Sequence, residues 1–203
     1  MYIVIEGQDG TGKSTEVELF GDFLRAQNKE VLTFHEPDGD LPVAHDLHDL
    51  IVIKGKDYHL EPLTNVALFT AARLELWHKL AEPVLRRGGY VISARNWWST
   101  LAYQGYGEGI SRSKIIRLTR EFMPSRYVSP DFSAILTLSD AVRAQREASR
   151  GKALETFEIK GDSFQSRVNH AYEKIAKDFN IPIIDASGSI DEVFLKLKKL
   201  FKF

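Results

Sequence analysis

The stretch YIVIEGQDGTGKST, residues Tyr2–Thr15, decides the fold. It opens with Tyr2–Glu6, an apolar run of strand length, and continues into a turn rich in glycine. Beyond the turn, Val17, Phe20 and Leu24 recur at the spacing that places side chains on one face of a helix. The stretch therefore predicts a strand, a tight turn and a helix in immediate succession.

The turn matches the phosphate-binding loop (P-loop) pattern G-x-x-x-x-G-K-[S/T] through Gly7, Gly12, Lys13 and Ser14. Glycines let the backbone curl so that its N–H groups converge on phosphate oxygens, and the helix N-terminus adds partial positive charge. We expect Lys13 to reach the β- and γ-phosphates and the Ser14 hydroxyl to bind Mg²⁺. An ordinary glycine-rich turn is the simpler alternative, but the flanking strand and helix favour a nucleoside triphosphate site. The predicted ATP-binding residues are Gly7, Gln8, Asp9, Gly10, Thr11, Gly12, Lys13, Ser14 and Thr15.

Composition limits the classes of protein to consider. The chain has 203 residues and a mass of 23.0 kDa, which is enough for one buried core and predicts a single domain over residues 1–203. A net charge of -1 gives no sign of a general nucleic-acid surface. The absence of cysteine excludes disulfides, thiol catalysis and thiolate metal sites. With no signal-like N-terminus and no apolar run of membrane-spanning length, we expect a soluble cytoplasmic protein without a membrane partner.

Apolar runs of strand length alternate with helical patterns along the whole chain. This alternation is typical of an α/β fold, in which a parallel sheet carries helices on both faces. Ligands in such folds bind beyond the carboxyl ends of the strands, so the residues that follow each strand are the candidates for a site. The predicted strands are Tyr2–Glu6, Glu30–His35, Tyr90–Ala94, Ser133–Leu138 and Ile181–Asp185.

Glu36 and Pro37 follow the second predicted strand. Proline restricts the preceding residue to extended backbone, so no helix continues there. The Glu36 carboxylate is placed to hold a Mg²⁺-bound water or to position a substrate. A turn with an exposed acid is the equally open alternative.

An aromatic ring and a guanidinium lie one turn apart on a long helix predicted over residues 61–87. Phe69 and Arg73 are neighbours on one surface of that helix, where they could stack on a base and hydrogen-bond to its carbonyl. A core phenylalanine beside a surface arginine is the simpler interpretation, and the spacing alone favours it.

Arg95 follows the third predicted strand and is directed toward the same edge of the sheet. Its planar fork suits phosphate recognition. Many P-loop proteins carry an aspartate at the end of a later strand to organise Mg²⁺, and here that place is Ala94. Trp97 and Trp98 are interpreted as packing residues rather than a ligand platform.

Three arginines follow the fourth predicted strand at spacings of three and four. Arg143, Arg146 and Arg150 therefore lie near one face of a helix. A solvated charged face is one interpretation. The other is a mobile lid, over about residues 143–161, whose arginines clamp a transferring phosphoryl group.

Taken in order, these pieces resemble the thymidylate kinase family of nucleoside monophosphate kinases. The resemblance covers nearly the whole chain. It rests most specifically on the Phe-x-x-x-Arg of Phe69–Arg73 and on the Ala-Tyr-Gln-Gly of Ala102–Gly105. Supporting pieces are the P-loop, Glu36-Pro37, Ser129-Pro130-Asp131, Arg146, Arg150-Gly151 and the Phe164, Val168, Tyr172 pattern.

The resemblance implies a three-layer P-loop kinase fold with a five-stranded parallel sheet and an arginine-bearing lid. It implies that the protein uses ATP and Mg²⁺ to phosphorylate dTMP to dTDP. It also implies a homodimer, which is common in the family. Catalysis would fall to Lys13, Arg95, Arg146 and Arg150. Metal binding would fall to Ser14 and, through water, to Glu36. The implied substrate-binding residues are Asp9 (3′-hydroxyl), Glu36, Pro37, Phe69 (stacking on thymine), Arg73 (the base), Arg95 (the monophosphate), Thr100 and Gln104 (the base), and Tyr103 (the sugar).

The family usually has an aspartate where this chain has Ala94, and Glu-Pro-Gly-Gly where this chain has Glu36-Pro37-Asp38-Gly39. We hypothesise that Asp38 or Glu36 takes over part of the Mg²⁺ shell. The loss also keeps two alternatives open: a kinase for another deoxynucleotide or a deoxynucleoside, and a nucleotide-binding module with weakened catalysis. A GTPase is disfavoured, because Asn28-Lys29-Glu30-Val31 lacks the aspartate of a guanine-reading motif and lies too early.

Overall fold

The structure is a computed structural model that describes residues 1–37, 41–139, 142–143, 145–146 and 156–202, with only the backbone of Lys56 and Glu158. The strands are β1 Tyr2–Gly7, β2 Val31–His35, β3 Tyr90–Ala94, β4 Phe132–Thr137 and β5 Ile183–Asp185. The helices are α1 Lys13–Arg25, α2 Pro42–His48, η1 Asp49–Ile53, α3 Gly55–Tyr58, α4 Pro62–Leu76, η2 Trp77–Ala81, α5 Glu82–Arg86, α6 Trp97–Thr100, η3 Leu101–Gly107, α7 Arg112–Phe122, α8 Ser125–Val128, η4 Glu158–Lys160, α10 Asp162–Phe179 and α11 Ile190–Phe201.

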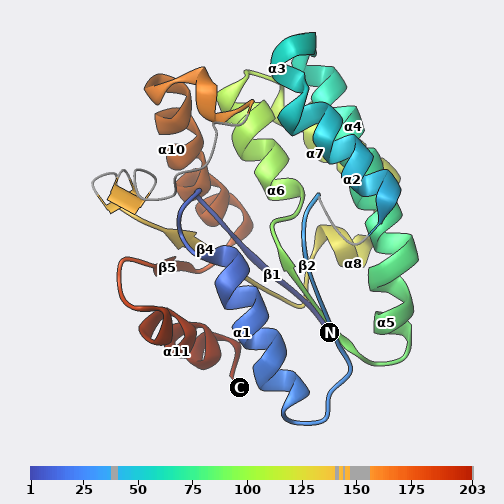
Figure 1. Ribbon diagram of the computed structural model, residues 1–203, viewed down its shortest axis with the longest axis vertical. Coiled ribbons are helices and arrows are strands. Elements are labelled where there is room, and N and C mark those ends of the chain that lie inside the picture. The colour runs from blue at the N-terminus through green and yellow to red at the C-terminus, as the bar shows by residue number, and fades with distance from the viewer. Residues whose placement is uncertain (38–40, 140–141, 144, 147–155, 203) are drawn as a thin grey trace.

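The strands form one five-stranded parallel sheet in the order β2-β3-β1-β4-β5 (Figure 1). All five predicted strands are therefore confirmed, with ends shifted by at most two residues. Because the strands are parallel, their carboxyl ends meet at one edge of the sheet. The P-loop, Glu36 and Arg95 all follow strands at that edge.

Strand β1 lies at the centre of the sheet, and its alternating side chains enter two separate cores. Tyr2 and Val4 pack on one face, in a core shared with α4, η3 and α10. Ile3 and Ile5 pack on the other face, against α1 and α11. Every residue of β1 is buried, which is typical of a strand covered by helices on both sides. The three-layer α/β prediction is confirmed.

The long helix predicted over residues 61–87 is interrupted. It runs as α4, then the π-helical turn η2, then α5. Pro83 lies in the first turn of α5, has no N–H to donate and would clash with a preceding carbonyl in a regular α-helix. A wider turn ahead of a proline relieves both problems, which explains the break.

Trp97 and Trp98 are buried beside Phe179, with ring centroids 5.2 and 6.0 Å from that ring, so their interpretation as packing residues is confirmed.

Of the predicted lid, Arg150 and residues 147–155 lie outside the described residues. No helix in the described part of the chain combines the length and apolar character needed to cross a membrane.

Candidate active site

The P-loop connects β1 to α1 in an open turn. Gly10 and Gly12 have φ of +79° and +87°, a left-handed backbone that glycine adopts without strain. The loop is tied to the sheet through Gln8, whose Oε1 accepts a hydrogen bond of 2.9 Å from the Leu138 N–H beyond β4. Thr11 closes the turn by donating its hydroxyl to the Gln8 carbonyl at 2.9 Å. The predicted loop is thus present and held in shape by its own residues.

Lys13 and Ser14, the first two residues of α1, differ in their exposure to solvent. The Lys13 side chain is buried, and its Nζ donates to the Gln8 carbonyl at 2.5 Å and lies 4.0 Å from Asp9 Oδ1. Ser14 and Thr15 are exposed on the first turn of the helix. The described residues contain no cluster of three or more acidic, histidine or cysteine side chains able to hold a metal alone. Mg²⁺ in nucleotide sites is usually bound by few protein ligands together with the phosphates. The Ser14 hydroxyl alone would therefore suffice as a protein ligand here.

Arg95 lies between the P-loop and α10, and both terminal nitrogens of its guanidinium donate hydrogen bonds. Its Nη2 donates to Asp9 Oδ1 in a short ion pair. Its Nη1 donates to the hydroxyls of Ser99 and Tyr172, both at 3.0 Å, and to the Gly7 carbonyl at 3.3 Å. Although burial opposes the charge, Asp9 and the neighbouring groups keep the pKa of Arg95 well above its usual value. The structure therefore holds a permanent positive charge beside the P-loop.

Glu6 supports this arrangement from below and was not among the predicted site residues. It is fully buried, and its Oε1 accepts hydrogen bonds from the Asn96 and Ser99 N–H groups at 2.7 and 3.1 Å. Its Oε2 accepts from the Ser99 hydroxyl at 2.9 Å. These bonds attach the segment that follows Arg95 to the end of β1, directly before the P-loop. The available signal was a carboxylate inside an otherwise apolar strand.

A second buried charge pair joins Glu36 to Arg73. Arg73 Nε donates to Glu36 Oε2 at 2.9 Å and its Nη1 donates to the Thr100 hydroxyl at 2.8 Å. The Tyr127 hydroxyl donates to the same Glu36 oxygen at 2.6 Å. Burial raises the pKa of Glu36 to about 7, against the opposing pull of Arg73 and Tyr127. Both simpler interpretations are wrong, because Glu36 is 1% exposed and Arg73 is 4% exposed.

The contacts of Glu36 give its predicted metal role no support. Its carboxylate is directed at Arg73 and Tyr127, and Pro37 beside it is also buried. The role of Glu36 at a metal stays a prediction, while its role in holding Arg73 is visible in the geometry. Asp38, the other predicted compensating acid, lies outside the described residues.

Four aromatic rings form a connected cluster, one of which, Phe69, lies beside Arg73. The Phe69 ring lies 5.3 Å from the Arg73 guanidinium carbon and 6.0 Å from the Phe157 ring. Phe157 also lies 5.8 Å from Tyr103 and 6.5 Å from Phe164. We call Phe69, Tyr103, Phe157 and Phe164 the aromatic cluster. Phe157 was missed by sequence reasoning, because it lies inside the predicted lid and at no helical spacing from the other rings.

Tyr103 and Gln104 enter the same region from η3. The Tyr103 hydroxyl donates to Asp9 Oδ2, so Asp9 joins Tyr103 to Arg95. Gln104 is 1% exposed, and its Nε2 has no hydrogen-bond partner among the described residues. An amide nitrogen buried without an acceptor is unfavourable, which marks Gln104 as a group that a ligand would satisfy. The structure thus brings Asp9, Phe69, Arg73, Arg95, Thr100, Tyr103 and Gln104 to one edge of the sheet.

His35 ends β2 and pairs in register with Ala94, where the family usually has an aspartate. Part of the ring is exposed. Partial removal from water, followed by the charges of Arg95 and Lys13, lowers the pKa of His35, so the ring is neutral at pH 7. Ala94 itself is fully buried in the core shared with α1. Neither side chain supplies the missing negative charge.

Arg146 lies on the other side of the P-loop. Its guanidinium donates to the carbonyls of Gly10 at 3.3 Å, Ala186 at 3.0 Å and Gly188 at 3.4 Å. It therefore bridges the P-loop and the loop between β5 and α11. The predicted role of Arg146 on the transferring phosphoryl group stays a prediction, as does that of Arg150.

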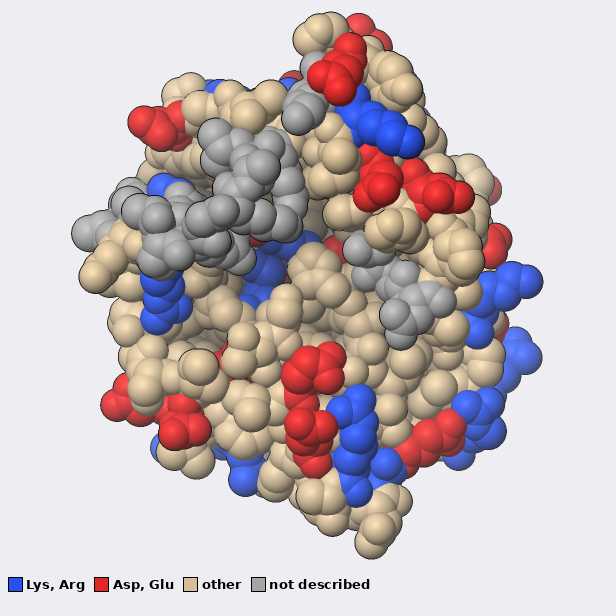
Figure 2. Space-filling view, viewed as in Figure 1, with Lys and Arg blue, Asp and Glu red and all other residues tan. Residues whose placement is uncertain are grey.

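A pocket of about 520 Å³ opens at this bridge, and we call it the α11 pocket. Glu16 is buried in its wall, where burial and then the charge of Asp191 raise the pKa of Glu16 to about 7. Its lining residues are Thr11, Gly12, Thr15, Glu16, Arg146, Ala186, Gly188, Ser189, Ile190 and Val193. Figure 2 shows Lys or Arg side chains inside a hollow near the middle of the face. The end of β1 lies at this place in Figure 1.

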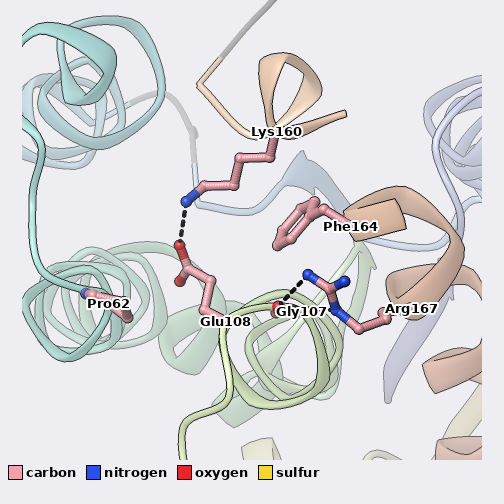
Figure 3. A pocket seen from close by; sticks show the side chains of 6 residues that line it. All are labelled: Pro62, Gly107, Glu108, Lys160, Phe164 and Arg167. Atoms are coloured by element: carbon pink, nitrogen blue, oxygen red, sulfur yellow. Dashed lines mark hydrogen bonds and ion pairs between the residues drawn. The ribbon is translucent and has the colours of Figure 1, made fainter. Parts of the chain in front are cut away.

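A second pocket, of about 340 Å³, lies beyond the aromatic cluster (Figure 3). Lys160 reaches across it to Glu108, with 2.9 Å between Nζ and Oε1. Phe164 and Arg167 line its opposite side, and Arg167 donates to the Gly107 carbonyl at 3.1 Å. The ion pair joins η4, which lies near the end of the predicted lid, to the residue that follows η3.

Comparison with known proteins identifies the family. The thymidylate kinase family model matches residues 5–196. The thymidylate kinase of Mesoplasma florum is 35% identical over 202 residues, which cover 98% of this chain and 94% of that protein. The thymidylate kinase of Nitrosospira multiformis is 36% identical over 200 residues, with 98% and 95% covered. The crystal structure of thymidylate kinase from Ehrlichia chaffeensis superposes with a TM-score of 0.77 at 28% identity, covering 100% of this chain and 98% of that one. The chain therefore belongs to the thymidylate kinase family.

Proposed function

We propose that this enzyme transfers the γ-phosphoryl group of ATP to dTMP, giving ADP and dTDP. Membership of the thymidylate kinase family supports the reaction class. The observation that carries the proposal is the convergence of two arginines at one sheet edge. Arg95 is held beside the P-loop by Asp9, and Arg73 is held beside the aromatic cluster by Glu36. A phosphate site and a base site thus lie on the same side of a nucleotide-binding loop.

In this reaction an oxygen of the dTMP phosphate attacks the γ-phosphorus, and the bond from that phosphorus to the β,γ-bridging oxygen breaks. The attacking oxygen is already anionic, so no strong general base is needed. Catalysis then consists of positioning and charge neutralisation. Lys13 supplies charge on the ATP side and Arg95 on the dTMP phosphate. The Arg95 network of Asp9, Ser99 and Tyr172 orients the guanidinium before substrate arrives.

Base recognition is assigned to Phe69, Arg73 and Gln104. Phe69 offers a ring face, and Arg73 uses Nε and Nη1 for Glu36 and Thr100, which leaves Nη2 to donate to a base carbonyl. The buried Nε2 of Gln104 offers a second donor. Thymine presents carbonyl acceptors on this edge, whereas cytosine presents an amino group, so two donors favour thymine. Tyr103 is assigned to the sugar, next to Asp9.

Mg²⁺ is the metal that we assign to this site, with the exposed Ser14 hydroxyl as its protein ligand. When bound, it neutralises charge on the ATP phosphates. The homodimer and the cytoplasmic location belong to the same proposal and follow from the family resemblance. Light scattering coupled to gel filtration measures the oligomeric state.

The test is direct detection of dTDP. Purified protein is incubated with ATP, dTMP and Mg²⁺, and nucleotides are separated by ion-exchange chromatography. The proposal requires dTDP and ADP in equal amounts, and their loss when a chelator removes Mg²⁺. ADP formed without dTDP would instead show an ATPase and would contradict the proposal.

A further inference from the structure

The α11 pocket contains a buried acid that the assignments above do not use. Glu16 is the second residue after Ser14. It is 3% exposed and lines the pocket. Among the residues that the structure describes, none forms a hydrogen bond with its Oε2. Burying a carboxyl oxygen without a partner costs free energy, so the fold keeps an unfavourable group at this place. A ligand that offers an N–H or O–H donor would remove the penalty.

The position of the pocket identifies the part of the ligand that reaches it. Thr11, Gly12 and Thr15 of the P-loop form one wall, so a triphosphate bound in the loop passes this wall. The aromatic cluster lies in the core on one face of β1, whereas Val193 of the pocket wall lies in the core on the other face. The nucleoside of the phosphoryl donor therefore enters the α11 pocket. Its volume of about 520 Å³ is within the usual range for a small-molecule site.

The remaining walls suit a purine. Ile190 and Val193 of α11 offer apolar surface for a ring face, and the Ala186 and Gly188 backbone forms the rim with Arg146. Glu16 is the acidic side chain in this lining, and a carboxyl oxygen accepts hydrogen bonds from N–H groups. Adenine carries one exocyclic amino group, at C6. Guanine carries a carbonyl there, and two acceptors facing each other repel.

We propose that Glu16 accepts a hydrogen bond from the 6-amino group of the donor's adenine and so makes this kinase selective for ATP. The inference rests on the proposed function for the presence of a phosphoryl donor. It goes beyond that function by assigning the donor-base specificity to a named side chain.

The experiment is a double-mutant cycle on binding. The dissociation constants of ATP and of purine riboside triphosphate, which lacks the 6-amino group, are measured by calorimetry with Mg²⁺ and without dTMP. For the unaltered protein, removal of the amino group should weaken binding by about tenfold or more, because the hydrogen bond to the Glu16 carboxyl is lost. In Glu16→Leu the two nucleotides should bind within about twofold of each other. Glu16→Gln, whose amide oxygen still accepts, should keep part of the discrimination.

Glu18→Leu is the matched control. Glu18 lies on the same helix but is exposed, so its replacement should leave the tenfold discrimination unchanged. Equal binding of the two nucleotides to the unaltered protein would overturn the proposal, as would discrimination that survives in Glu16→Leu. Tight binding of GTP to the unaltered protein would overturn it as well. Because no acceptor is present, failure of dTMP turnover would contradict the proposed function without touching this result.

Discussion

The two sides of the P-loop are built in different ways. On the acceptor side, Arg95 and Arg73 each donate to several protein side chains, including a carboxylate, before any substrate is present. On the donor side, Arg146 donates to backbone carbonyls, and Glu16 keeps an oxygen without a partner among the described residues. In our proposal, the acceptor side is therefore preorganised by the protein, whereas the donor side is completed by its ligand. Preorganised charge is what phosphoryl transfer requires, since no reorganisation is then needed in the transition state.

The largest effect is expected from the buried pair that supports the base site. Arg73→Ala would leave the Glu36 carboxylate buried with the Tyr127 hydroxyl as its remaining side-chain donor among the described residues. Breaking such a buried pair typically costs about 3–5 kcal/mol, and we expect the free energy of unfolding to fall by this amount. Urea denaturation measures the change. Arg87→Ala, which removes an exposed pair with Glu30, is the control and should cost much less. Equal losses in the two variants would show that the Glu36–Arg73 pair is not a structural unit.

Arg95→Ala is expected to have the next largest effect, on turnover. The variant removes the positive charge assigned to the acceptor phosphate, and we predict that kcat falls at least about a hundredfold. Arg112→Ala, which removes an exposed arginine paired with Asp178, should leave kcat near its normal value. Circular dichroism checks that both variants fold. Near-normal turnover in Arg95→Ala would rule out its role.

Ala94→Asp is expected to have the smallest effect of the three. If Asp38 or Glu36 supplies part of the Mg²⁺ shell, restoring the usual aspartate should change the Mg²⁺ concentration for half-maximal turnover by less than about tenfold. Ala94→Asn, of the same size without charge, separates the charge from the crowding at this buried position. A large gain in turnover in Ala94→Asp alone would show that the shell was never compensated.

The fold could be predicted closely from the sequence because it depends on local patterns. Each strand is an apolar run between turn residues, whereas the order of the strands in the sheet does not follow from their spacing. The interruption at η2 could not be predicted from the apolar spacing, which continues through it. It depends on how the chain accommodates Pro83, a local conflict that the hydrophobic pattern does not record.

The candidate site could be predicted in its residues more than in its contacts. Arg73 and Glu36 were both candidates, but their pairing across 37 residues of sequence depends on how the fold brings α4 to the residue that follows β2. Glu16 and Phe157 gave no signal, since one looks like a polar helix residue and the other like an isolated aromatic. Their importance comes from burial, which only the folded chain determines.

The central claim is that the acceptor side is prebuilt for one base, and the most direct test is a panel of acceptors. ADP production from ATP and Mg²⁺ is measured with dTMP, dUMP, dGMP, dCMP and thymidine in parallel. A strong preference for dTMP over dCMP, dGMP and thymidine is predicted, because Arg73 and Gln104 offer donors to a thymine edge and Arg95 requires a phosphate. Comparable turnover with dCMP or dGMP, or with thymidine, would contradict the account of the acceptor side.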